Sequence, residues 1–226
     1  MILSISLLIA ASYLLGSIPF GLWIALSLKG VDVREVGSKN IGATNVWRVC
    51  GPAIGSAVFT LDLLKGLLPP LVARYALHLD RPDSRWIVLS ALAAILGHNY
   101  SLFLGFSGGK GIATSGGALL GAAPLVGAAA GGVFIAGLLV SSMISVGSIA
   151  AAASLPLLMW WLCRNDCYLF AFACAASLMA IYKHRANIAR LRTGTERRVN
   201  LFGPRSAKPA EPPPAETKEA PPDAGP

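Results

Sequence analysis

Two short polar stretches of the chain have the composition of phosphate-binding loops. The first, GSKNIGATNVWR at 37–48, combines glycines with the short polar side chains of Ser38, Asn40, Thr44 and Asn45 and with the guanidinium of Arg48. Glycines leave backbone N–H groups accessible, and an arginine fork can bind a phosphate through two parallel hydrogen bonds. The same residues would also suit an ordinary turn followed by a capped helix. An anion cradle and a turn therefore both fit this stretch.

The second stretch, GGKG at 108–111, places Lys110 among three glycines at the predicted start of a helix. Backbone amides at a helix N-terminus attract an anion, and the lysine adds a full positive charge. The stretch is not a P-loop, because Leu104 occupies the first glycine position of that motif and Gly111 the Ser/Thr position after the lysine. We predict phosphate binding here without nucleotide hydrolysis.

A third polar segment begins at His184. Asn187 follows three residues later, so a helix leaving a membrane would present both side chains on one face. Arg190 and Glu196 lie just beyond. A histidine at a membrane boundary is also common as a plain surface residue, and arginines there can anchor to anionic lipid heads.

Asp62 and Lys65 stand inside an apolar run. Each unpaired charge would cost roughly 2.5–3.5 kcal/mol at the centre of a bilayer. Their i,i+3 spacing allows them to pair, so we interpret them first as a structural pair and second as site residues.

Composition excludes an ordinary soluble domain. Apolar residues make up 54% of the 226 residues and charged residues 13%, against about 25% charged in a typical soluble protein. The mean hydropathy is +0.62. The apolar residues run continuously instead of alternating, which favours transmembrane helices over a β-barrel. The net charge of +8 comes from basic residues that flank the apolar runs, a pattern of cytoplasmic loops that does not require nucleic acid.

We predict an all-α, polytopic integral membrane helix bundle. Apolar runs lie at 2–28, 53–77, 86–104, 112–140, 142–162 and 166–182. Cytoplasmic loops of membrane proteins carry an excess of Lys and Arg, so we predict that the basic segments 29–51 and 183–198 face the cytoplasm. The loop 78–85, in which basic and acidic residues balance, is then predicted to lie outside. Splitting the long run at Gly121–Pro124 gives seven transmembrane helices, with the N-terminus out and the C-terminus in; five is the alternative. We expect a membrane domain at 1–202 and a disordered, Pro-rich cytoplasmic tail at 203–226.

Several familiar motifs are missing. The sequence has no Asp-rich Mg²⁺ motif, no HExxH, no GxSxG and no paired CxxC sets among its four cysteines. Phe103, five residues after His98, stands where an H-x4-D pattern would have aspartate. We therefore expect no metal and no cofactor, and chemistry that depends on anion-binding groups.

Five motifs occur together and in order: GSIPFG at 16–21, GSKNIGATNVWR at 37–48, DLLKG at 62–66, GH…GGKGIAT at 97–114 and HRANIARL…G.E at 184–196. Over about residues 13–198 the chain thereby resembles the acyl-phosphate-dependent glycerol-3-phosphate acyltransferases, the PlsY family. It departs from that family at Ser142-Met143, where Arg-Tyr is usual, and at Gly147, a position that is sometimes serine.

The resemblance implies acyl transfer from acyl phosphate to the 1-hydroxyl of sn-glycerol 3-phosphate, giving lysophosphatidic acid and phosphate, the first acylation of bacterial phospholipid synthesis. It implies a multi-pass protein of the bacterial inner membrane whose site faces the cytoplasm, with membrane lipid around it. Acyl phosphate and glycerol 3-phosphate would be its partners, with no nucleic acid and no acyl-carrier protein or CoA as direct donor.

On that resemblance we assign three groups of residues. The expected catalytic residues are Ser38, Arg48, Lys110, His184 and Asn187. The expected substrate-binding residues are Asn40, Thr44, Asn45, Gly108, Gly109, Gly111, Ser145 and Ser148. The expected supporting residues are Asp62, Lys65, His98, Arg190 and Glu196.

A different class of function remains open from the residues alone. A transporter of phosphate or a small organic anion could use the same glycine-rich, cationic loops. The two halves of the sequence show no internal repeat. A transporter would also be expected to hold its polar motifs near the membrane midplane, whereas we predict that these gather on one side.

Overall fold

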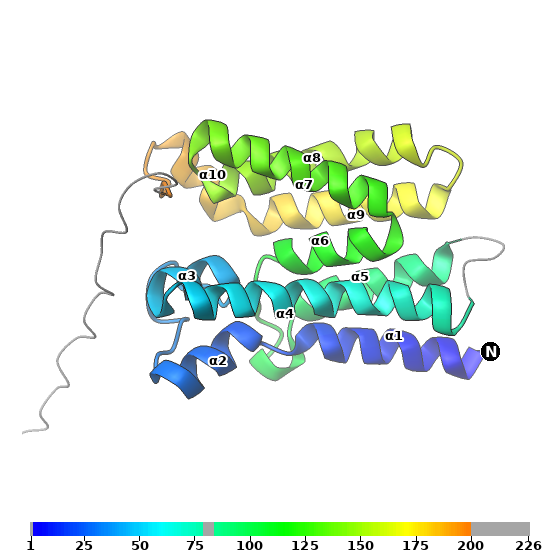
Figure 1. The fold of residues 1–226 in the computed structure, drawn as a ribbon, viewed down its shortest axis with the longest axis horizontal. Helices are drawn as coiled ribbons and strands as arrows, with labels where there is room; N and C mark the ends of the chain where they lie inside the picture. The colour runs from blue at the N-terminus through cyan, green and yellow to red at the C-terminus, as the bar shows by residue number, and fades with distance from the viewer. Residues whose placement is uncertain (1, 79–83, 200–226) are drawn as a thin grey trace, which may run out of the picture.

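The protein is an antiparallel helix bundle (Figure 1). The computed structural model describes residues 2–78 and 84–199, and within them every regular element is a helix. The elements in chain order are α1 (Ile2–Ser17), α2 (Phe20–Lys29), α3 (Ala43–Cys50), α4 (Pro52–Leu71), η1 (Val72–Ala76), α5 (Arg85–Asn99), η2 (Leu102–Leu104), α6 (Ile112–Ala122), α7 (Pro124–Ser141), α8 (Ile144–Leu162), α9 (Cys167–Lys183) and α10 (Arg185–Arg192). The predicted all-α class is confirmed. The Pro-rich tail at 203–226 lies outside the described residues.

The long helices form two groups joined by α6 (Figure 1). In one group α1, α4 and α5 pack together, and in the other α7, α8 and α9 do; α6 contacts members of both. The short helices α3 and α10 lie at the same end of the bundle, opposite the N-terminus. The polar stretches that contain them therefore meet at one end.

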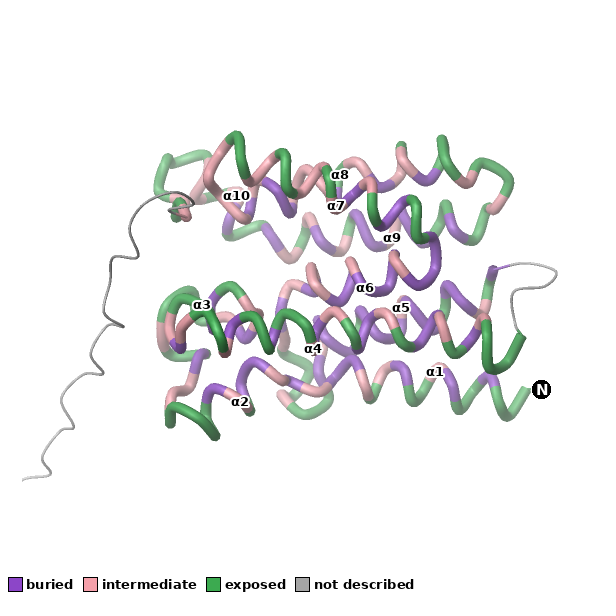
Figure 2. Tube along the Cα trace, in the orientation of Figure 1, coloured by how far each residue is buried: buried purple, intermediate pink, exposed green. Residues whose placement is uncertain are grey.

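Apolar side chains on the outer surface mark the bundle as a membrane protein. Val140 of α7 is 90% exposed and Leu157 of α8 is 73% exposed. Most residues on the outward faces of these two helices are exposed or only partly buried (Figure 2). Four helical segments in the described chain are long and apolar enough to cross a membrane: 2–29, 52–76, 124–141 and 144–162. A fifth is present if α9 and α10, bent by 57° at their junction, count as one. The predicted seven crossings and their orientation stay predictions.

The first apolar run, which we counted as one transmembrane helix, is divided into α1 and α2. Pro19 has no N–H and a fixed φ, so the helix ends at Ser17 and resumes at Phe20. The break frees the carbonyl of Ile18, which accepts a hydrogen bond of 2.8 Å from the Lys65 ammonium. The GSIPFG motif thus supplies a partner for a buried charge of another helix.

Asp62 and Lys65 pair as predicted from their spacing. Lys65 Nζ lies 2.8 Å from Asp62 Oδ1 and 5.5 Å from the centre of the Phe20 ring. Both side chains are almost fully buried. Carboxylate, carbonyl and aromatic ring together solvate the ammonium, which lets the two charges persist inside the bundle.

The predicted break at Gly121–Pro124 is also present. Helix α6 ends at Ala122 and α7 begins at Pro124, which is suited to the first turn of a helix because that turn needs no N–H. Helix α6 has 11 residues and is therefore short.

Glycines let α6 lie directly on α4. A Cβ atom on Gly66 would overlap the carbonyl of Thr114, and one on Gly117 would overlap the carbonyl of Leu63. The two backbones are therefore in contact where they cross. This contact fixes the start of α6, and with it the GGKG loop, against the helix that carries Asp62.

We expect Gly117→Ala to destabilise the bundle by about 1–3 kcal/mol, because its methyl group must push backbone atoms apart in a packed interface. Gly116→Ala is the matched control, since a Cβ atom there meets no other atom within 4 Å. Thermal unfolding in detergent measures both, and equal midpoints for the two variants would contradict the close contact.

Candidate functional site

The loop before α3 is organised by one asparagine. Asn45, which is 1% exposed, donates from Nδ2 to the carbonyls of Val33, Val36 and Asn40, and its Oδ1 accepts from the Ser38 amide at 2.7 Å. Asn45 therefore shapes the loop from inside. Asn45 also lines the cavity described below, so its predicted part in substrate binding stays a prediction.

The loop leaves other groups open. Asn40 Oδ1 accepts from the Gly42 amide at 2.9 Å and fixes the turn into α3. Ser38, Thr44 and Arg48 are exposed on the face toward the centre of the site. The turn that the sequence allowed is present, and the side chains of the predicted anion cradle line the cavity described below.

The GGKG loop presents backbone amides. No hydrogen bond in the described part of the chain involves the amides of Lys110 or Gly111, although Gly111 has a φ of +74° and precedes α6 directly. Two free N–H groups at a helix N-terminus beside an ammonium form an anion-binding nest.

The glycines of this loop also have a packing role. Cβ atoms on Gly108 and Gly109 would overlap His98, and one on Gly111 would come within 2.6 Å of Asn99 Oδ1. Gly108 and Gly109 do not line the cavity described below. A side chain at Gly108 or Gly109 would therefore clash with the end of α5. This packing requires glycine at both positions, whether or not a ligand approaches them as predicted.

His184 lies at the bend between α9 and α10. It is 3% exposed, and its Nδ1 lies 2.8 Å from the carbonyl of Ala180. A carbonyl can only accept, so Nδ1 carries the hydrogen and Nε2 has a free lone pair when the ring is neutral. Burial, with a smaller contribution from the nearby Lys110 charge, lowers the pKa of His184 to about 4. The ring is therefore neutral near pH 7 and can accept a hydrogen bond at Nε2.

A continuous chain of hydrogen bonds connects the second and third polar segments. Lys110 Nζ donates to Asn187 Oδ1 at 2.5 Å, and Asn187 Nδ2 donates to Glu196 Oε1 at 2.7 Å. Arg190 Nε binds the other oxygen of Glu196 at 2.7 Å. The sequence placed all four residues in the site, and the structure shows that they act as one network.

These groups enclose a cavity of about 350 Å³ at the end of the bundle that holds α3 and α10. Predicted residues that line it are Ser38, Asn40, Thr44, Asn45, Arg48, Asp62, His98, Lys110, Gly111, Ser145, Ser148, His184, Asn187, Arg190 and Glu196. Lys65 lies behind Asp62 and is not part of the wall. The predicted convergence of the three segments is thus present in the structure.

The cavity concentrates positive charge. Burial, together with Arg190 and Arg48, lowers the pKa of Lys110 to about 8. Burial and the Arg197 charge lower the pKa of Arg48 as well. Burial raises the pKa of Glu196, but donation from Asn187 and Arg190 outweighs it and keeps the carboxylate ionised. An anion entering the cavity would relieve the repulsion among the cations.

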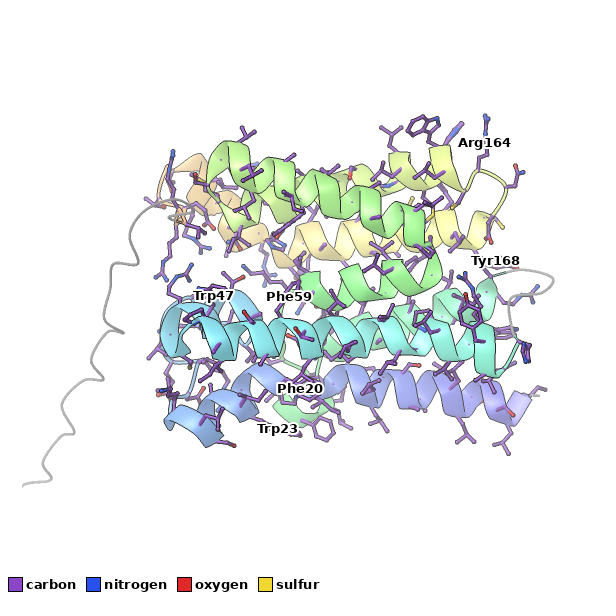
Figure 3. The ribbon with its side chains drawn as sticks, viewed as in Figure 1. Phe20, Trp23, Trp47, Phe59, Arg164 and Tyr168 are labelled. Atoms are coloured by element: carbon purple, nitrogen blue, oxygen red, sulfur yellow. The ribbon has the colours of Figure 1, made fainter. Side chains whose placement is uncertain are left out.

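Sequence reasoning missed some of the cavity wall. Lys39 and Arg197 add charge, and Arg197 donates to the carbonyl of Gly37 at 3.4 Å. Phe59 of α4 and Phe134 of α7 close the inner side; Figure 3 shows Phe59 pointing from α4 toward the other group of helices. Aromatic residues inside apolar runs give no sequence signal that separates a cavity wall from an ordinary core.

An apolar groove of about 200 Å³ continues from the cavity between α4, α6, α7 and α8. Phe59, Ile112, Ala113, Phe134 and Ser148 line both spaces. The rest of the groove is aliphatic, with glycines at Gly116, Gly127 and Gly131. The site therefore combines a cationic head region with an apolar extension along the membrane-facing helices.

A cationic pocket at the end of a helical membrane bundle, joined to an apolar groove, has the shape and charge to fit an anionic amphiphile. The family model described as glycerol-3-phosphate acyltransferase matches residues 6–194. The chain belongs to this family, in its PlsY-type form.

Individual relatives agree. The glycerol-3-phosphate acyltransferase of Geobacter metallireducens is 50% identical over 192 residues, covering 85% of this chain and 96% of the relative. That of Geotalea daltonii is 45% identical over 195 residues, covering 86% and 96%. The crystal structure of PlsY, an integral membrane glycerol 3-phosphate acyltransferase, in its glycerol 3-phosphate form matches with a TM-score of 0.81 at 41% identity, covering 87% of this chain and 96% of that one. Its lysophosphatidic acid form matches with a TM-score of 0.78 at 40% identity, covering 86% of this chain and 95% of that one.

We predict that acyl transfer declines as the pH rises through about 8, because Lys110 then loses the charge that attracts an anion. Lys110→Arg keeps its charge and should move the decline to higher pH. His184, with a pKa of about 4, should give no limb near pH 6.5. Initial rates of wild type and variant between about pH 5.5 and 9.5 test this; a wild-type profile without an alkaline limb would contradict it.

Proposed function

We propose that this chain transfers the acyl group of acyl phosphate to the 1-hydroxyl of sn-glycerol 3-phosphate and releases lysophosphatidic acid and inorganic phosphate. The observation that carries the proposal is the shared wall between the cationic cavity and the apolar groove. A phosphorylated amphiphile needs both spaces at once. PlsY, of similar fold, has been crystallised in glycerol 3-phosphate and lysophosphatidic acid forms, which supports these small molecules as ligands.

Two phosphate groups require two sets of donors. The free amides of Lys110 and Gly111, with the Lys110 ammonium, would hold the phosphate of the donor. Ser38 and Arg48, which line the same cavity from the segment 37–48, would hold the phosphate of glycerol 3-phosphate, with Thr44 from the same segment. Ser145 and Ser148 line the cavity at the start of α8 and would add hydroxyl contacts.

The reaction needs a positioned hydroxyl and a stabilised leaving group. His184 Nε2 would accept a hydrogen bond from the 1-hydroxyl, whose oxygen attacks the acyl carbon. The bond from that carbon to the phosphate oxygen then breaks, and the hydroxyl proton ends on a phosphate oxygen. With a pKa of about 4, His184 orients the hydroxyl instead of holding its proton. Lys110 and Arg48 stabilise the negative charge that grows on the departing phosphate.

Asn187, Arg190 and Glu196 would act as a support for Lys110. The hydrogen bond from Lys110 to Asn187 sets the position of the ammonium, and Glu196 fixes Asn187 in turn. This arrangement holds the cation in place before substrate arrives, which is the condition for electrostatic catalysis.

The topology that we propose has seven crossings, with the N-terminus outside and the site at the cytoplasmic face of the bacterial inner membrane. The N-terminus and the labelled Arg164 and Tyr168 lie at one end of the bundle, and Trp47 of α3 lies at the other (Figure 3). The basic segments 29–51 and 183–198 accompany the cavity, which favours the cytoplasm for that end. A transporter would be expected to hold its anion site near the midplane, and the position of this cavity does not favour one.

We expect the purified protein to release inorganic phosphate from palmitoyl phosphate only when glycerol 3-phosphate is present. Lysophosphatidic acid, measured by mass spectrometry, should form in equal amount. Palmitoyl-CoA in place of the acyl phosphate should give no product. Uptake of labelled phosphate into proteoliposomes without any acyl product would instead support the transporter.

The groove predicts a change in chain-length preference. Gly131 lines the groove and a Cβ atom there meets no other atom within 4 Å, so Gly131→Leu should fill space that the acyl chain needs. We expect kcat/KM for palmitoyl phosphate to fall about tenfold or more relative to that for a short-chain acyl phosphate. Gly132→Leu is the control, because Gly132 is equally unobstructed but does not line the groove. The same preference in both variants would show that the chain binds elsewhere.

A further inference from the structure

The ring of His98 is the surface on which the GGKG loop lies. His98 belongs to the last turn of α5 and is 4% exposed. A Cβ atom on Gly109 would overlap Nε2, and one on Gly108 would overlap the His98 carbonyl. That carbonyl also accepts the Gly109 amide at 3.1 Å. The main chain and the side chain of His98 therefore both fix the position of the GGKG loop relative to α5.

The other side of the ring faces a fixed charge. His98 Nδ1 lies 3.7 Å from Asp62 Oδ1, which is too long for a hydrogen bond but places the carboxylate beside this edge of the ring. Asp62 is held in turn by Lys65 at 2.8 Å. The carboxylate thus selects the ring orientation that places Nδ1 toward α4 and Nε2 toward the loop.

The end of α5 is also held from α9. Lys183 Nζ donates to the carbonyl of Asn99 at 2.6 Å and lies 4.2 Å from the centre of the Tyr100 ring. Lys183 directly precedes His184. Its hydrogen bond to Asn99 therefore fixes the end of α5 next to His184, the residue proposed to bind the reacting hydroxyl. A shift of His98 would consequently change the spacing between Lys110 and His184.

We propose that His98, oriented by Asp62, is a positioning residue that sets the GGKG loop and thereby the donor-phosphate site formed by Lys110 and the amides of Lys110 and Gly111. This role rests on the proposed function. It gives a role to the buried histidine and to its charged neighbours Asp62 and Lys65, of which His98 and Asp62 also line the cavity. Removing the ring takes away the surface on which the loop lies, so the amides and the ammonium that would bind the donor phosphate lose their fixed positions and the donor binds more weakly.

Steady-state kinetics with palmitoyl phosphate and glycerol 3-phosphate test the proposal in the purified full chain. We expect His98→Ala to raise KM for palmitoyl phosphate by about tenfold or more, with a smaller change in KM for glycerol 3-phosphate. His98→Gln, which restores a polar group of similar reach, should recover part of the loss. Asp62→Asn should have a weaker effect that largely disappears when His98 is already alanine.

A purely structural role would give a different result. Partial unfolding removes active molecules, so kcat would fall with both KM values unchanged. Ser90→Ala is the matched control, because Ser90 is buried on the same helix and its hydroxyl donates to the Ile87 carbonyl of that helix. It should leave both KM values as in wild type.

The outcomes separate the two proposals. An inactive wild type would overturn the proposed function, and the positioning role with it. An active wild type with His98→Ala kinetics that are unchanged, or altered in kcat alone, would overturn only the positioning role. Should His98→Ala fail to fold, Asp62→Asn and His98→Gln decide the question by the same comparison of KM values.

Discussion

Repulsion among cations in a partly buried cavity is the constraint on which the site depends. Lys110, Arg48, Arg190 and Arg197 line one space, and burial, together with the charges of Arg190 and Arg48, lowers the pKa of Lys110. Glu196 offsets part of the repulsion by binding Arg190 and, through Asn187, Lys110. The positive charge that Glu196 does not neutralise can attract a dianionic ligand. Such a ligand binds more strongly to cations that are already in place than to cations that must be brought together on binding.

Holding such a cavity at the end of a membrane bundle requires rigid connections. The segment after α10 supplies one of them, because the Val199 amide donates to the Ser142 carbonyl at 2.7 Å and Arg197 reaches Gly37. It thereby ties the corner between α7 and α8 to the loop before α3. Asn45 gives that loop its shape from within.

Breaks in two of the apolar helical runs also help to hold the bundle together. The break at Pro19 exposes a carbonyl that takes the Lys65 ammonium, and the break before Pro124 turns α6 back into α7. In hydrocarbon a free backbone group is costly unless another group satisfies it, so each break is placed where a partner exists. The apolar groove runs beside the second break, where the short α6 leaves room between its neighbours.

The sequence by itself determined the class of fold, the break before Pro124, the pairing of Asp62 with Lys65 and most of the cavity wall. These features follow from local signals: continuous apolar runs, a proline inside one of them, charges at helical spacing and glycine-rich loops with cations. Tertiary structure alone decided that Asn45 serves the loop, that Gly108 and Gly109 serve His98, and that Phe59 and Phe134 close the cavity. Those roles depend on which atoms of distant helices approach, and residue type and spacing along one chain do not encode that distance.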